Sequence, residues 1–276
     1  NMAAGLLAIR YGFKGVNYAT TSACSSSAHA IANACYQIRM GLADVMLAGG
    51  SEAAIECSGI GGFNALHALS TRNDSPQTAC RPFSASRDGF VLGEGAGTLV
   101  LEEYEHAKAR GAHIYAEIVG IGLTADAYHL TASDPDGVGA RNAMQLAVNE
   151  ADVHVSQIDY INTHGTSTPI GDIAEVKAIQ DLFGEHAYNL SLTSSKSMIG
   201  HLLGGSGAVE AIISILSMHH GIVTPTINHE EGDEDANIDY KLNFTFNKAQ
   251  QREIRYAMSN NFGFGGHNAC LIFKKY

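Results

Sequence analysis

Three segments of the chain repeat the order strand, loop and helix, and no other feature limits its possible folds as strongly. Each begins with a short extended stretch, continues through a loop of small and polar residues, and ends in a helix. The segments span residues 15–40, 158–180 and 190–220, with strands expected at 16–19, 158–162 and 190–193. Strands that alternate with helices predict an α/β fold with parallel strands. Sites in such folds form in the loops past the carboxyl ends of the strands.

The three loops carry the chain's most reactive side chains, which are Cys24 in the first, His164 in the second, and Lys196 and His201 in the third. The helices that follow are expected to end near Gly41, to begin at about Asp172 and to include residues 208–213. Residues 44–48 predict one further short strand, which should be buried because its residues are mostly apolar.

A charged helix at residues 102–111 separates two halves of the chain. It ends at Gly111, and a new strand is expected at 113–119. We therefore predict two domains, residues 1–111 with the cysteine and residues 112–276 with both histidines. The first and third strand–loop–helix segments resemble one unit used twice, which indicates an internal duplication.

Composition narrows the classes of function. The chain has 276 residues, of which 45% are hydrophobic and 16% charged, a balance typical of globular proteins. Its net charge of −11 argues against a nucleic-acid partner, because a phosphate-binding surface should be basic. No apolar run approaches the roughly 18 to 20 residues that cross a bilayer, so no membrane partner is expected. The acidic run at 230–235 is expected to be a solvated loop and not a metal site.

The first residue and the cysteines indicate whether the chain is secreted and whether it is part of a longer protein. Asn1 does not open a signal peptide, and we expect the chain to be part of a longer protein. The five cysteines are irregularly spaced without a C-x-x-C pair, which predicts free thiols in a reducing, cytoplasmic compartment and no zinc site. Cys35 shares a helical face with Cys24 but lies about 16 Å along it, too far for a disulfide.

Cys24 lies among very small residues, in the sequence Thr-Thr-Ser-Ala-Cys-Ser-Ser-Ser-Ala. Free N–H groups at the start of the following helix should lower the pKa of the thiol and favour the thiolate. Small neighbours would let a substrate reach the sulfur, as at a nucleophile elbow. A lone cysteine also fits the role of a buried structural thiol. His29 lies about 140° around the helix from Cys24, so a catalytic partner must come from elsewhere.

The two loop histidines each fit a site as well as a structural role. His164 follows a strand and precedes a glycine and three hydroxyl residues, although turn and capping chemistry also accounts for residues 166–172. His201 precedes a glycine-rich helix start that disfavours imidazolium, so its ring should be neutral and donate a hydrogen bond. The nearby glycines lack the Gly-Lys-Ser/Thr of a phosphate loop. Residues 260–268 are too rich in glycine for a strand interior, which indicates either N–H groups presented to an oxyanion or a plain turn before an apolar strand.

Four motifs occur together, namely Ala-Cys-Ser-Ser at 23–26, Asn-Thr-His-Gly-Thr at 162–166, Lys196 with Gly-His at 200–201, and Asn-Phe-Gly-Phe-Gly-Gly at 261–266. With them the chain resembles, over essentially its whole length, the β-ketoacyl-acyl carrier protein synthases, the elongating condensing enzymes of the thiolase superfamily. Residues 88–95 and 126–130 add to a resemblance to the synthase II type. The resemblance implies a five-layered αβαβα fold of two similar halves, a homodimer, and an N-terminal third that this chain lacks.

The resemblance also implies roles for the motif residues. Cys24 would be the nucleophile that takes an acyl chain from acyl carrier protein. His164 and His201 would bind the malonyl thioester carbonyl and stabilise the enolate formed on loss of carbon dioxide. The backbone N–H groups of Cys24 and Phe264 would form the oxyanion hole. Lys196 would hold the His164 loop and the local charge rather than transfer protons.

Further residues are implied around this centre. Glu210 would lie in the buried partner region of Lys196, and Asp172 and Glu175 would support the site. The substrate-binding residues would be Phe63, Thr131, Thr166, Thr168, Gly263 and Phe264, of which Thr166 and Thr168 would contact the phosphopantetheine arm while Phe63 and Phe264 would gate the acyl pocket. The resemblance implies no metal and no cofactor other than the phosphopantetheine on the carrier protein.

Two positions depart from the family's pattern, and the shared motifs separately leave other functions open. His67 stands where synthase II members often carry Arg at the carrier surface, and His267 stands where Thr is usual. A ketosynthase of a polyketide or aryl polyene pathway shares the same motifs. A non-catalytic chain-length subunit would lack the nucleophile, so Cys24 argues against it. A thiolase would need a second active-site cysteine, and Cys270 lies in an apolar strand.

Overall fold

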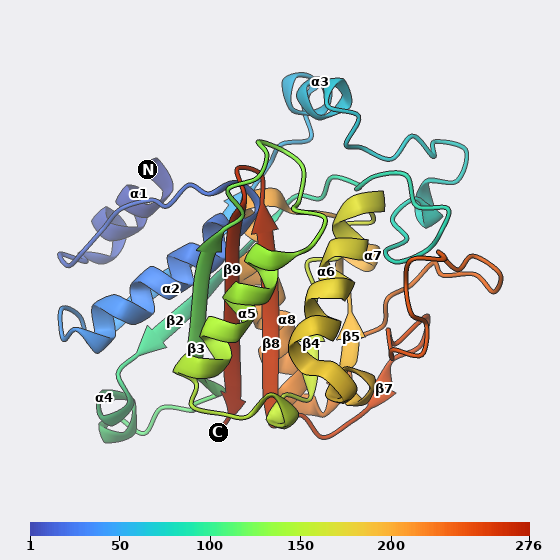
Figure 1. The fold of residues 1–276 in the computed structure, drawn as a ribbon. Helices are drawn as coiled ribbons and strands as arrows, with labels where there is room; N and C mark the ends of the chain where they lie inside the picture. The colour runs from blue at the N-terminus through green and yellow to red at the C-terminus, as the bar shows by residue number, and fades with distance from the viewer.

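A computed structural model describes all of residues 1–276 (Figure 1). The helices are α1 (Met2–Tyr11), α2 (Ser26–Arg39), α3 (Cys57–Ala65), α4 (Tyr104–Ala109), α5 (Val138–Glu150), α6 (Pro169–Phe183), α7 (Lys196–Ile199) and α8 (Ser206–His220). The strands are β1 (Val45–Glu52), β2 (Gly95–Glu102), β3 (Ala116–Ala125), β4 (Tyr160–Asn162), β5 (Ser191–Thr193), β6 (Ile222–Val223), β7 (Gln250–Gln251), β8 (Tyr256–Gly263) and β9 (His267–Lys275). No helix combines the length and the apolar character that a membrane span requires.

The central sheet has five strands in the order β3-β9-β8-β4-β5. As predicted, β4 runs parallel to β5, and it is also parallel to β8. The sheet is mixed, because β8 and β9 form an antiparallel hairpin and β9 pairs antiparallel with β3. The glycine-rich segment is the turn of this hairpin, so part of it, up to Gly263, belongs to a strand.

The sheet is covered by helices on both faces (Figure 1). Alternate residues of β9 divide between the two cores: Cys270 and Ile272 pack with α5 and α6, while Leu271 and Phe273 pack with α2 and α8. This is the period of two expected of a strand that is buried on both faces. The antiparallel pair β1–β2 packs on the other side of α2 and α8. The chain thus contains four successive layers, α, β, α and β, of the five-layered thiolase-like arrangement.

Several predicted elements differ in their details. Residues 16–19 form no strand, since no backbone hydrogen bond joins them to a neighbouring segment. The strand at 44–48 exists as β1 but is mostly exposed, because Val45 and Leu47 lie on an outer face that nothing in the chain covers. Helix α6 begins at Pro169 rather than at Asp172, since proline fits the first turn of a helix. The charged helix is limited to α4, because Glu102 is the last residue of β2 and pairs with Val45 of β1.

The suspected repeat is visible in the backbone. In both units a short 3₁₀ turn leads into a long helix, at Ala23 before α2 and at Leu203 before α8. Both residues have positive φ angles, 50° and 43°, which non-glycine residues rarely adopt. The two helices then pack so closely that a Cβ on Gly207 would lie 2.6 Å from the backbone nitrogen of Ala28. The domain boundary after Gly111 stays a prediction.

Candidate active site

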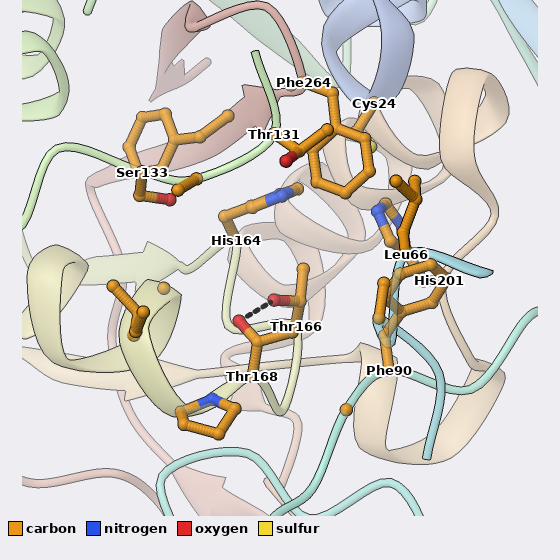
Figure 2. Close-up of a pocket in the computed structure, with 18 of the residues that line it drawn as sticks. Cys24, Leu66, Phe90, Thr131, Ser133, His164, Thr166, Thr168, His201 and Phe264 are labelled. Carbon is orange, nitrogen blue, oxygen red and sulfur yellow. Dashed lines mark hydrogen bonds between the residues drawn. The ribbon is translucent and has the colours of Figure 1, made fainter. Parts of the chain in front are cut away.

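The three predicted loops meet at one place in the fold. The Sγ of Cys24 and ring nitrogens of His164 and His201 all lie within 4.8 Å of one another, and all three residues are buried. They line a cavity of about 300 Å³. The same cavity is lined by every residue predicted to bind substrate, namely Phe63, Thr131, Thr166, Thr168, Gly263 and Phe264. Figure 2 shows the side chains of the cavity around one space, with Cys24 and Phe264 across from Thr166 and Thr168.

The turn that holds Cys24 is anchored to the β8–β9 hairpin. The Ser25 hydroxyl donates to the carbonyl oxygens of His267 (2.6 Å) and Asn261 (3.3 Å). Gly263 passes so close that a Cβ there would lie 2.6 Å from the Ser22 carbonyl oxygen and 3.1 Å from the Cys24 nitrogen. The small residues around Cys24 are therefore required by the close approach of two backbones.

The backbone N–H groups of Cys24 and Phe264 lie near enough to the Cys24 sulfur to favour its ionised form and act to lower its pKa. The hairpin turn is held in this position because the N–H of Gly265 donates to the Leu130 carbonyl (2.7 Å) and the N–H of Asp126 donates to that of Gly266 (2.9 Å). Two N–H groups beside the nucleophile can stabilise an oxyanion that forms on a carbonyl attacked by the sulfur. This is the placement that the resemblance implies for an oxyanion hole, and that role stays a prediction.

The expectation of a resting thiolate is wrong. Burial raises the pKa of the Cys24 thiol to about 11, although the Lys196 charge and the two N–H groups act in the opposite direction. The N–H groups at the helix start do stabilise a thiolate. The loss of hydration on burial disfavours the thiolate by a larger amount, so the pKa rises. Cys24 is therefore a thiol at neutral pH, and its reaction requires a group that accepts the proton.

His201 is held as a neutral ring with a defined tautomer. Its Nδ1 accepts a hydrogen bond from the N–H of Leu203 (3.3 Å) and lies 2.9 Å from the Ser206 hydroxyl. The proton is therefore on Nε2. Burial, with the nearby Lys196 charge, lowers the pKa of His201 well below its ordinary value. The lowered pKa agrees with the predicted neutral ring, with burial rather than the helix start as the main cause, and the donor role stays a prediction.

The loop that carries His164 is held by a carboxylate and not by Lys196. The N–H groups of His164 and Gly165 donate to the two oxygens of Glu175, both at 2.8 Å. Burial raises the pKa of Glu175 to about 7. Burial also lowers the pKa of His164 well below its ordinary value, with further contributions from Lys196 and His201. Both catalytic candidates among the histidines are therefore neutral.

Lys196 is paired with Glu210, as predicted. Both side chains are only 1% exposed, and the ammonium donates to Oε1 of Glu210. The other oxygen of Glu210 accepts a hydrogen bond from the Asn261 amide (2.6 Å), which ties the pair to β8. The pair therefore places a compensated positive charge behind the three reactive side chains.

The cavity has an apolar and a hydroxyl-rich side. Phe63 lies 5.3 Å from Phe90 and 6.4 Å from Phe264 between ring centroids, and Cys24 packs with Phe90 and Leu203. Across from these, the hydroxyls of Thr166 and Thr168 are hydrogen-bonded at 2.9 Å. Phe90 and Leu203 were not predicted as site residues, although Phe90 belongs to one of the motifs that carry the resemblance.

The remaining histidines near the site lie outside its centre. His29 turns to the Ser22 hydroxyl (2.9 Å) and the Ser25 carbonyl (3.1 Å), which confirms that it is not the partner of Cys24. His67 is exposed at the rim of the cavity. The ring of His267 lies against Gly265, where it would be 2.8 Å from an added Cβ. Gly265 and Gly266 have φ angles of 88° and 74°, so both positions of this turn favour glycine.

The raised pKa of Cys24 predicts how its alkylation depends on pH. Because the thiolate is the nucleophile, its rate of reaction with iodoacetamide should rise about tenfold per pH unit between pH 7 and 9. Neither histidine should add an inflection in this range, since both are neutral there. Peptide-resolved mass spectrometry would separate Cys24 from the exposed Cys57. A plateau of the Cys24 rate below pH 8 would contradict the raised pKa.

Two family models and several curated proteins match this chain. Residues 1–107 match the model of the β-ketoacyl synthase N-terminal domain, and residues 115–230 match that of the C-terminal domain. The 3-oxoacyl-(acyl-carrier-protein) synthase 2 of Staphylococcus aureus (strain COL) is 52% identical over all 276 residues, and that of Vibrio harveyi is 51% identical. The chain spans 66% of the length of each of these relatives.

Solved structures share the fold of this chain. A ketosynthase in the type II PKS complex AntDE:AntF, solved with its acyl-carrier protein, superposes with a TM-score of 0.96 at 38% identity, over 99% of this chain and 66% of that one. A β-ketoacyl synthase from Burkholderia phymatum STM815 gives a TM-score of 0.87 at 46% identity, over 93% of this chain and 61% of that one. With both domain models matched in order and relatives half identical to it, the chain belongs to the β-ketoacyl synthase family.

Proposed function

We propose that the protein is a β-ketoacyl-acyl carrier protein synthase, an acyltransferase that catalyses decarboxylative Claisen condensation in fatty acid elongation. The observation that carries this proposal is the convergence of one thiol and two neutral imidazoles on a cavity, with the backbone N–H groups of Cys24 and Phe264 beside the sulfur. A condensing enzyme needs a nucleophile to hold the acyl group, an oxyanion hole, and donors for an enolate oxygen.

In the first half-reaction, the Cys24 sulfur attacks the thioester carbonyl of the acyl carrier protein substrate. The N–H groups of Cys24 and Phe264 receive the oxyanion, the carrier thiol leaves, and the Cys24 proton passes to the departing sulfur. Because the thiol is protonated at rest, a neutral imidazole is needed to relay this proton. His164 is suited to this task, since its buried Nδ1 has no hydrogen-bond partner in the chain.

In the second half-reaction, malonyl-acyl carrier protein replaces the first carrier. The C–C bond to its carboxylate breaks, carbon dioxide leaves, and the electron pair forms an enolate whose oxygen accepts hydrogen bonds from His164 and His201. The enolate carbon attacks the acyl carbonyl, and the bond to the Cys24 sulfur breaks. The thiolate regains a proton from solvent or a histidine, and the β-ketoacyl product leaves on the carrier.

The alternative is a ketosynthase of a polyketide or aryl polyene pathway, which would use the same chemistry. A structural neighbour described as a type II PKS ketosynthase is 38% identical, whereas relatives named for synthase 2 reach 52%. The higher identity favours fatty acid elongation. A chain-length subunit without a nucleophile fits poorly, because Cys24 lies at the centre of a complete site.

The proposal extends to partners and location. We propose acyl carrier protein as the partner, since the arm-binding threonines lie across the cavity from the nucleophile, and a homodimer as the working form. The chain uses no metal and no cofactor beyond the phosphopantetheine of its substrates. The five free thiols support a reducing, cytoplasmic location.

The full-length protein should be incubated with a long-chain acyl-acyl carrier protein and its intact mass measured. We expect one acyl group on the wild type and none on Cys24→Ala. Addition of malonyl-acyl carrier protein should discharge the acyl group and yield a β-ketoacyl product. Absence of acylation with both fatty and polyketide starters would refute the proposal, and acylation by polyketide starters alone would favour the alternative.

A further inference from the structure

The acidic run at 230–235 is not simply a solvated loop, as its sequence suggested. Asp233 accepts hydrogen bonds from the N–H (2.8 Å) and the hydroxyl (2.7 Å) of Ser86, and lies 3.6 Å from the Arg81 guanidinium. Asp235 lies 2.9 Å from the guanidinium of Arg87. Two carboxylates of the run are therefore docked onto residues 81–87, a segment from the other half of the chain.

Arg87 connects this docking contact to the substrate cavity. Its side chain is only 1% exposed and lies between Asp235 and the buried Asp172, which is 3.5 Å away. Its Nε–H donates to the carbonyl oxygen of Thr168 (3.1 Å), Nη2 donates to that of Pro169 (2.7 Å), and Nη1 donates to that of Ser84 (2.7 Å). Arg87 thus holds the backbone of a threonine that lines the cavity.

The loop that Arg87 holds has a strained backbone. Ser167, between the two cavity threonines, has a φ of 67°, which a non-glycine residue adopts only when its surroundings impose it. Its N–H donates to Asp172 (3.1 Å), its carbonyl accepts from the N–H of Gly89 (3.0 Å), and its hydroxyl accepts from the N–H of Arg81 (3.0 Å). The polar groups of Ser167 are therefore bound to Asp172, to Arg81 in the segment that the acidic run contacts, and to Gly89 just beyond that segment.

We propose that Arg87 and Asp235 are positioning residues that set the Thr166–Thr168 loop for the phosphopantetheine arm of the substrate. This inference rests on the proposed function. It assigns a role in arm binding to two residues that do not line the cavity. Without the Asp235 charge, Arg87 has one acidic partner left, Asp172. The guanidinium of Arg87 is then free to turn toward that carboxylate, and its hydrogen bonds to the carbonyl oxygens of Thr168 and Pro169 weaken.

The test compares two alkylating reagents on the full-length protein. Chloroacetyl-pantetheine carries its electrophile on the arm, and chloroacetamide does not. The ratio of their second-order rates at Cys24, measured by peptide-resolved mass spectrometry, reports binding of the arm, independent of thiol reactivity and of the folded fraction. It also needs no condensation activity, so failure of the proposed function would appear separately, as missing acyl transfer from carrier proteins.

We expect Asp235→Asn and Arg87→Lys to lower the ratio about tenfold, the scale of one lost hydrogen bond to the arm, while chloroacetamide reacts as with the wild type. Glu231→Gln is the matched control, because it removes the same charge from an exposed residue of the same run, and it should keep the wild-type ratio. Equal ratios in wild type and Asp235→Asn would overturn the proposal. So would equal losses with both reagents, which would indicate a purely structural role.

Discussion

Replacement of His201 by alanine should slow condensation about 10²- to 10³-fold, the usual effect of removing one donor to a developing oxyanion. Nε2–H of His201 faces the cavity because Nδ1 is occupied by the Leu203 N–H. Acylation of Cys24 should be retained, since the oxyanion hole for that step consists of backbone N–H groups. The measurement is the release of labelled carbon dioxide from malonyl-acyl carrier protein, together with the intact mass of the acyl-enzyme.

His220→Ala provides the matched control, because His220 is an exposed histidine at the far end of α8. This variant should retain the wild-type rate in both steps. A His201→Ala protein that releases carbon dioxide within a few-fold of the wild-type rate would contradict the donor role. Loss of acylation and decarboxylation together would instead assign His201 to the first half-reaction.

The second large effect concerns the buried ion pair. Glu210→Ala should lower the free energy of unfolding by about 3–5 kcal/mol, because it leaves the Lys196 charge buried without its partner. It also removes the acceptor for the Asn261 amide. Replacing both members, as Lys196→Met with Glu210→Leu, should recover much of this loss, since apolar groups of similar volume need no charge compensation. Urea denaturation of the full-length protein followed by circular dichroism measures both changes.

Glu253→Ala serves as the control for this experiment, because Glu253 pairs with Arg255 where both side chains are 74% exposed. Removal of such a surface pair should barely change the stability. If Glu210→Ala unfolds at the same urea concentration as the wild type, Lys196 does not carry a buried charge. If the double variant is no more stable than Glu210→Ala, packing rather than charge accounts for the loss.

Local features of the sequence were enough to place the reactive loops. The order of strand, loop and helix around His164 and His201 can be predicted from apolar periodicity and from glycine and hydroxyl residues. These signals depend only on residues a few positions apart. The β8 strand was missed for the same reason. Its residues Ser259, Asn260 and Asn261 are buried polar groups, so no apolar pattern marks them as a strand. Only the hairpin partner β9 and the parallel neighbour β4 make that segment a strand.

The reactive residues and the family resemblance follow from short stretches of sequence, because a motif needs only neighbouring residues. The charge states follow from the packing of the folded chain. A helix start favours the Cys24 thiolate, but burial outweighs it and raises the pKa to about 11. The fold also brings Glu175, rather than Lys196, to the backbone of the His164 loop. It likewise brings Asp235 to Arg87. Desolvation and ion pairing depend on what surrounds a group in space, and those surroundings come from residues far away in the sequence.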